Sequence, residues 1–157
     1  MTAQQPTLTR EGLAVALLGL LSNIPGIVTA DRRLRHWTDV PAEERPAIFL
    51  STGNQKAKQD ASGAPAVWTF NYTVDLYVYS EDPALTPSTM LNQYVDAIEA
   101  ALKPAAPWGP PGYPGTVQVL GDQTGRIRHA WVLDVETDEG VLGTTAIASI
   151  RLEIQLT

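Results

Sequence analysis

Few residues of this 157-residue sequence are of the types that carry out catalysis. His36 and His129 are its two histidines, and neither has an Asp or Glu one helical turn away on an expected helix. The chain has no cysteine, which excludes disulfides, zinc–thiolate sites and thiol nucleophiles. A general base needs a partner within hydrogen-bond reach, so we expect both histidines to be structural and no residue to be catalytic.

Three carboxylates alternate at Asp134, Glu136 and Asp138, like the first ligands of a calcium-binding EF-hand loop. Such a loop needs glycine at position 139 and glutamate at position 145, where this chain has Glu139 and Thr145. Alternate residues of a strand project from one face of a sheet. A solvated sheet surface therefore explains the three carboxylates, and no metal site is expected.

Motifs for nucleotides and common hydrolytic reactions are missing from the sequence. It contains no GxxxxGK, GxGxxG, HExxH or GxSxG pattern. Gly109, Gly112 and Gly115 are evenly spaced, but the prolines among them remove backbone donors that a phosphate cradle needs. We therefore expect no cofactor and no enzymatic activity.

Charge limits the possible partners. The chain has 11 basic and 17 acidic residues, a net charge of −6, which argues against an open nucleic-acid-binding face. Arg32, Arg33 and Arg35 form a local basic run that could grip phosphate. In an acidic chain, salt bridges at a subunit interface are the favoured role for these arginines.

Two segments are expected to be long loops, at about residues 51–66 and 104–116. The first is polar and glycine-punctuated, carries Lys56 and Lys58, and is expected to be a loop or the tip of a hairpin. The second is rich in proline and holds Trp108 and Tyr113, which either fold over their own sheet or lie at a subunit interface. The candidate interface residues are Arg32, Arg33, Arg35, Lys56, Lys58, Trp108 and Tyr113.

Two amphipathic helices must position these residues. Leucines and Ile24 recur at helical spacing over residues 8–24, Thr7 or Thr9 can cap the start, and Pro25-Gly26 ends the helix. Thr86-Pro87 begins a second helix, with the apolar stripe Leu91, Tyr94, Val95, Ile98 and Leu102. The apolar run 13–21 is shorter than the roughly 20 residues of a membrane span, so a cytoplasmic chain without a cleaved signal is expected.

Alternating patterns predict the strands. The longest covers residues 68–78, and others are expected at 126–137 and 146–156, with a short apolar strand at 47–50 and a possible one at 117–120. In the segment 126–137 the pattern predicts one shared stripe of Ile127, His129, Trp131, Leu133 and Val135. The sum is one α+β domain over residues 1–157, a mainly antiparallel sheet with two amphipathic helices packed on one face.

The order of these segments and their residue patterns resemble those of one known protein family. The segments that carry the resemblance are NIPGIVTADR at 23–32, PAIFL at 46–50, the long strand at 68–79, the turn Glu81-Asp82-Pro83, LNQYVDAIEAAL at 91–102 and the last alternating strand after Gly143. The chain is similar to the tail terminator (tail completion) proteins of long-tailed bacteriophages, the group similar to the minor tail protein U of lambdoid phages.

The resemblance implies a virion protein that acts by steric blocking. Six subunits would form a ring that caps the head-proximal end of the tail tube, ends tube growth and presents the surface for head–tail joining. The implied partners are further copies of the chain, the tail tube protein, a neck or connector protein, and genomic DNA that passes without sequence-specific binding. Two alternatives stay open, another neck or head–tail connector protein and a small α+β enzyme or binding domain.

Overall fold

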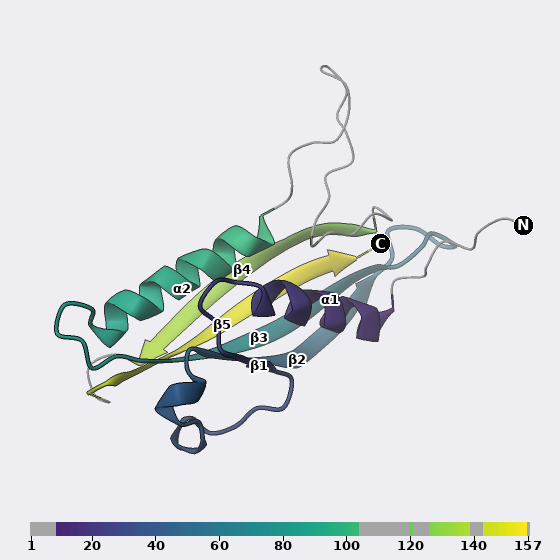
Figure 1. Cartoon of the computed structure of the whole chain (residues 1–157). Coiled ribbons are helices and arrows are strands. Elements are labelled where there is room, and N and C mark those ends of the chain that lie inside the picture. The colour runs from purple at the N-terminus through teal and green to yellow at the C-terminus, as the bar shows by residue number, and fades with distance from the viewer. Residues whose placement is uncertain (1–8, 104–119, 121–125, 139–142, 157) are drawn as a thin grey trace, which may run out of the picture.

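A computed structural model describes residues 9–103, 120, 126–138 and 143–156. Its helices are α1 (Arg10–Ser22) and α2 (Pro87–Leu102), with short 3-10 turns η1 (Trp37–Asp39) and η2 (Ala42–Glu44). Its strands are β1 (Thr29–Asp31), β2 (Ala47–Lys58), β3 (Val67–Tyr79), β4 (Ile127–Asp138) and β5 (Thr145–Leu156). They form one sheet of order β1-β2-β3-β5-β4, in which only the β1–β2 pair is parallel (Figure 1). The predicted α+β class is confirmed.

Both helices begin where the sequence places a cap. The Thr9 hydroxyl accepts a hydrogen bond from the Gly12 amide at 2.9 Å, so α1 begins one residue later, at Arg10. Thr86 caps α2 in the same way, with Pro87 at the first helical position. At its other end α1 stops at Ser22, before the Pro25-Gly26 turn. The two predicted helices are confirmed, and α1 is two residues shorter at each end than expected.

The main core lies between the sheet and the two helices, which cover the same face (Figure 1). The helices contribute Leu13, Leu17 and Leu21 from α1 and Leu91, Ile98 and Leu102 from α2. The sheet contributes the alternate residues of β3 and β5 that the pattern predicted. The buried set of the two strands is Phe70, Tyr72, Val74, Leu76, Val78, Ala146, Ala148, Ile150, Leu152, Ile154 and Leu156.

The opposite face of the sheet, here called the outer face, is covered at one end only within the described residues. There Val40 packs with Ala47, Phe49 and Tyr77 in a second, smaller buried cluster. Arg45 holds this segment down by donating to the carbonyls of Trp37 (2.6 Å) and Val40 (2.9 Å) and to the Thr145 hydroxyl (2.8 Å). Beyond this cluster most side chains of the described outer face are polar, among them Thr69, Asn71 and Arg151.

The expected loop at 51–66 is wrong in its first half. β2 continues to Lys58, and its residues pair with β3 from Ala47↔Tyr77 to Lys58↔Val67, so the connection spans only residues 59–66. Tertiary pairing, rather than aliphatic content, makes this polar segment a strand, because its backbone hydrogen bonds go to β3. The hairpin alternative is confirmed for the shorter connection. The expected loop at 104–116 and the strand at 117–120 lie outside the described residues, apart from Leu120.

The predicted single stripe along β4 is also wrong. Register shifts occur between Ile127 and His129 and between Val132 and Asp134. Ile127 and Val135 lie opposite the core residues Leu156 and Ile150, whereas His129 and Trp131 lie opposite Gln155 and Glu153 on the outer face. Each inserted residue exchanges the two faces of a strand, which a strictly alternating sequence pattern does not reveal.

Candidate assembly interface

The sheet has two open edges within the described residues. β1 pairs with β2 only at residues 47–49, so residues 51–58 of β2 have β3 on one side and no described strand on the other. β4 is the outermost strand at the opposite end of the sheet. We call these segments the β2 edge (residues 51–58) and the β4 edge (residues 128–138). An open edge presents unpaired backbone donors and acceptors to which another strand can bind.

Lys56 and Lys58 lie on the β2 edge, exposed to solvent. Their cross-strand neighbours are Thr69 and Val67, which alternate with the core residues of β3, so both lysines project from the outer face. The Lys58 ammonium is 3.6 Å from the carboxylate of Asp60, and both side chains are largely exposed. The two predicted interface lysines therefore lie on one open edge and one face.

The β4 edge carries the three alternating carboxylates. Asp134, Glu136 and Asp138 lie opposite Arg151, Ser149 and Ile147, which places all three on the outer face, as the strand pattern predicted. Asp134 forms a two-pronged ion pair with Arg151, in which Nε donates to Oδ1 at 2.7 Å and Nη2 donates to Oδ2. Glu136 and Asp138 are exposed. The described residues include no group of three His, Asp or Glu side chains arranged to hold a metal ion.

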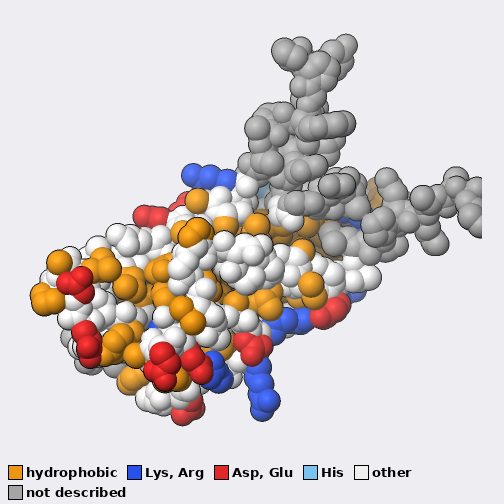
Figure 2. All heavy atoms as spheres, in the orientation of Figure 1, with side chains coloured by type: hydrophobic (Ala, Val, Ile, Leu, Met, Phe, Trp, Pro, Cys, Tyr) orange, Lys and Arg blue, Asp and Glu red, His pale blue; other side chains and the backbone are white. Residues whose placement is uncertain are grey.

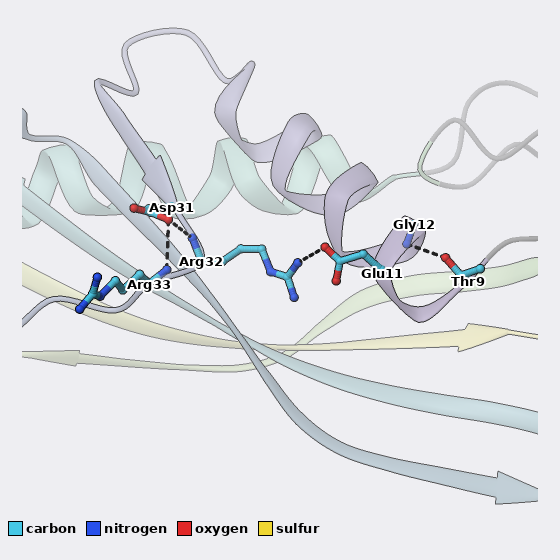
Figure 3. A network of polar contacts seen from close by, with 6 residues as sticks. All are labelled: Thr9, Glu11, Gly12, Asp31, Arg32 and Arg33. Atoms are coloured by element: carbon cyan, nitrogen blue, oxygen red, sulfur yellow. Dashed lines mark hydrogen bonds and ion pairs between the residues drawn. The ribbon is translucent and has the colours of Figure 1, made fainter.

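The arginine run follows directly after β1, which ends at Asp31. The Asp31 carboxylate accepts hydrogen bonds from the backbone amides of Arg32 (2.7 Å) and Arg33 (3.1 Å) and so orders the turn (Figure 3). The Arg32 side chain extends to α1, where Nη1 donates to the Glu11 carboxylate at 2.5 Å. Arg33 points away from this network and is exposed (Figure 3).

Arg35 is also engaged within its own chain. Its Nη2 donates to the Glu44 carboxylate at 2.6 Å, and its guanidinium lies 5.5 Å from the centre of the Phe49 ring. Its carbonyl accepts a hydrogen bond from the Tyr77 hydroxyl at 2.7 Å. Two of the three arginines thus tie local structure together, whereas Arg33 is the member of the run whose guanidinium is directed to solvent. The predicted interface residues Trp108 and Tyr113 lie outside the described residues.

Two apolar residues of the β4 edge are exposed, which the sequence pattern did not predict. Trp131 is 40% exposed and Leu133 is 46% exposed. The Trp131 ring stacks on His129 with ring centres 3.8 Å apart, and burial lowers the pKa of His129. The alternating pattern predicted both Trp131 and Leu133 to belong to an apolar stripe with Ile127. The register shifts turn Trp131 to the outer face and leave Leu133 at an irregular position, so both apolar side chains are exposed on the strand that carries the carboxylates.

Asp75 is a half-buried carboxyl group in the middle strand of the outer face. It lies between Phe49 of β2 and Ser149 of β5, and burial raises its pKa. A carboxylate in this position loses hydration without an ion-pair partner among the described residues. Its charged form therefore disfavours the folded monomer.

Replacing Asp75 by asparagine is expected to stabilise the monomer at neutral pH. A carboxyl whose pKa is higher in the folded than in the unfolded state lowers stability as pH rises through the folded-state pKa. The difference between D75N and wild type should therefore shrink as pH falls through the folded-state pKa and vanish below the unfolded aspartate value of about 3.9. Urea unfolding of both proteins at neutral and acid pH measures this. A D75N protein less stable at neutral pH would show instead that the carboxylate accepts a stabilising hydrogen bond.

Three hollows on the described surface are lined without histidine. One at the start of α1 is lined by Arg10, Glu11, Trp68 and Phe70, among others, and one beside the β2 edge by Arg32, Ser51 and Tyr72. A third lies between the end of α1 and α2, in a region where apolar side chains are visible on the helix-bearing side (Figure 2). Neither His36 nor His129 lines any of these three hollows, so they offer no support for the enzyme alternative.

Comparison with known proteins gives a fold relationship. No family model matches the chain, and no curated protein matches it in sequence. A solved chain from the virion of a native gene transfer agent particle has the same fold, with a TM-score of 0.52 and 11% sequence identity, over 92% of this chain and 93% of that chain. In the described part, neither helix is long and apolar enough to cross a membrane. The chain thus shares its α+β fold, over nearly its whole length, with a component of a virion particle.

Proposed function

We propose that this chain is a structural virion protein, a tail terminator whose ring caps the head-proximal end of a phage tail tube. The observation that carries the proposal is the fold shared with a virion-particle chain over 92% of the sequence. The resemblance in segment order to the tail terminator family supports the more specific role. The ring stops tube growth by occupying the end to which the next tube subunits would add, and its free side receives the neck or connector protein.

The two open sheet edges support assembly. A closed ring needs two different surfaces on each subunit, because each copy uses one to bind the copy before it and the other to bind the copy after it. The β2 edge and the β4 edge are such a pair, at opposite ends of one rigid sheet. With a net charge of −6, the chain repels DNA in general, so the genome can pass without sequence-specific binding. The protein then acts in the host cytoplasm during assembly and in the virion at the head–tail junction.

The wild-type chain is expected to form closed rings in solution. Six chains of 17.0 kDa give a particle of about 102 kDa, which sedimentation velocity separates from the monomer across a concentration series. Negative-stain images of the largest species should show sixfold rings. A protein that remains monomeric in every sample, also in the presence of purified tail tubes, would contradict the ring.

Deletion from a parent phage distinguishes a terminator from a neck protein. Without a terminator, tube subunits continue to add, so overlong tails are expected in electron micrographs. Without a neck connector, tails of normal length and separate filled heads accumulate instead. Tails of normal length with separate filled heads would show that the chain is a virion protein of the neck rather than a tail terminator.

A further inference from the structure

We propose that copies of this chain join edge to edge, with the β2 edge of one copy pairing with the β4 edge of the next copy. This inference rests on the proposed ring and names the surface that closes it. The occupant of each open edge is therefore a second copy of the same chain, and the contact is a continued β-sheet.

Strand direction permits this arrangement. β2 is antiparallel to β3, β3 to β5, and β5 to β4, so β2 and β4 run in opposite directions within one copy. Successive copies with the same orientation then place β2 beside an antiparallel β4. The outer faces of the copies stay on the same side, so residues that project from the outer face at both edges become neighbours.

The charges on the two edges are opposite and have the same spacing. Lys56 and Lys58 project from the outer face of β2, and Glu136 and Asp138 project from the outer face of β4. An antiparallel register with Lys56 opposite Asp138 places Lys58 opposite Glu136. Such cross-strand ion pairs contribute roughly 0.2–1 kcal/mol each. Asp134 is already paired with Arg151, so Glu136 and Asp138 are the carboxylates available to the next copy.

Charged residues on an open edge can either prevent association or select a partner, and the signs of the charges distinguish these two roles. Natural proteins place lysines and bulges on open strands to prevent unspecific association. Lysines on both edges would make copies repel each other, whereas here the β2 edge is basic and the described outer-face end of β4 is acidic. The basic residue Arg128 lies near the other end of β4. The bulges and the opposite charges together favour one register with one partner.

Charge reversal on one edge at a time tests the contact. The variant K56E/K58E carries acidic groups on both edges, and the variant E136K/D138K carries basic groups on both edges. Each alone is expected to lose the ring in sedimentation velocity, because like charges meet at every interface. All four positions are exposed, so each variant should keep the wild-type melting temperature. An equimolar mixture should recover rings of alternating copies, and so should the fourfold variant K56E/K58E/E136K/D138K on its own.

A matched control reverses two exposed acids of α2, Asp96 and Glu99, in the variant D96K/E99K. It has the same net charge as E136K/D138K and is expected to form rings like wild type. Wild-type rings that persist in both single-edge variants would overturn the edge contact while the terminator proposal stands. Single-edge variants that lose the ring without recovery in the mixture also overturn it. A wild-type chain that never forms rings contradicts the proposed function itself.

Discussion

Replacing Leu17 by aspartate is expected to abolish cooperative unfolding of the chain at neutral pH, leaving no folded population. Leu17 is fully buried in the main core between α1 and the sheet. Losing its side chain alone costs about 2–5 kcal/mol, and an unpaired carboxylate in an apolar site adds a desolvation cost. Since domains of this kind have a total stability of roughly 5–15 kcal/mol, these two costs together approach the whole free energy of unfolding.

The control for Leu17 lies two residues earlier on the same helix. Val15 is 56% exposed, so V15D inserts the same charge into α1 without entering the core and should change stability by less than about 1 kcal/mol. Circular dichroism melting and urea titration compare the two variants. The buried carboxyl should have a raised pKa, so any residual structure in L17D should increase at acid pH. Equal melting of L17D and V15D would show that the assigned helix face is wrong.

Replacing Gly26 by alanine is expected to cause the second-largest loss of stability. Gly26 has a φ of +91°, a conformation that costs a residue with a side chain about 1–2 kcal/mol. An added Cβ would also overlap the hydroxyl of Tyr94 on α2 and lie 3.3 Å from its Cζ. Either the Tyr94 side chain or the turn after α1 would have to shift.

Two further variants separate these costs. Gly63 also has a positive φ, +80°, but an added Cβ there meets nothing within 4 Å, so G63A should lose only the backbone part. In the Y94F background the hydroxyl is absent, so G26A should cost less than it does beside the native tyrosine. Urea unfolding of wild type, G26A, Y94F and G26A/Y94F gives the coupling free energy between the two positions, and G63A gives the backbone cost alone. If G26A and G63A lost the same free energy, close contact between the turn and α2 would be excluded.

Local signals determined most of the secondary structure. The caps at Thr9 and Thr86, the helical spacing of the leucines in α1 and the strict alternation in β3 and β5 predicted four elements within a few residues of their bounds. Each signal depends on residues within about four positions along the chain, so it can be read from the sequence without knowing which segments pack together. The α+β class followed from the order of these elements.

The placement of the candidate interface residues was predictable only in part. Lys56 and Lys58 were selected from a segment expected to be a loop, and the structure places them on an open strand instead. Arg32 and Arg35 were predicted to form salt bridges at a subunit interface, and the structure shows each in an ion pair within its own chain, to Glu11 and Glu44. The partners of these side chains are supplied by the folded arrangement, so no local pattern identifies them.

The sequence by itself therefore determined the class of the fold, its two helices and its long strands, and it showed that few residues are of catalytic types. Only the tertiary structure decided the length of β2, the two register shifts of β4 and the presence of two oppositely charged open edges. The physical reason is the range of the interactions. The apolar stripe of a helix and the alternation of a strand are patterns of residues close together in the sequence. Strand pairing, bulges and open edges depend on which distant segment accepts each backbone hydrogen bond.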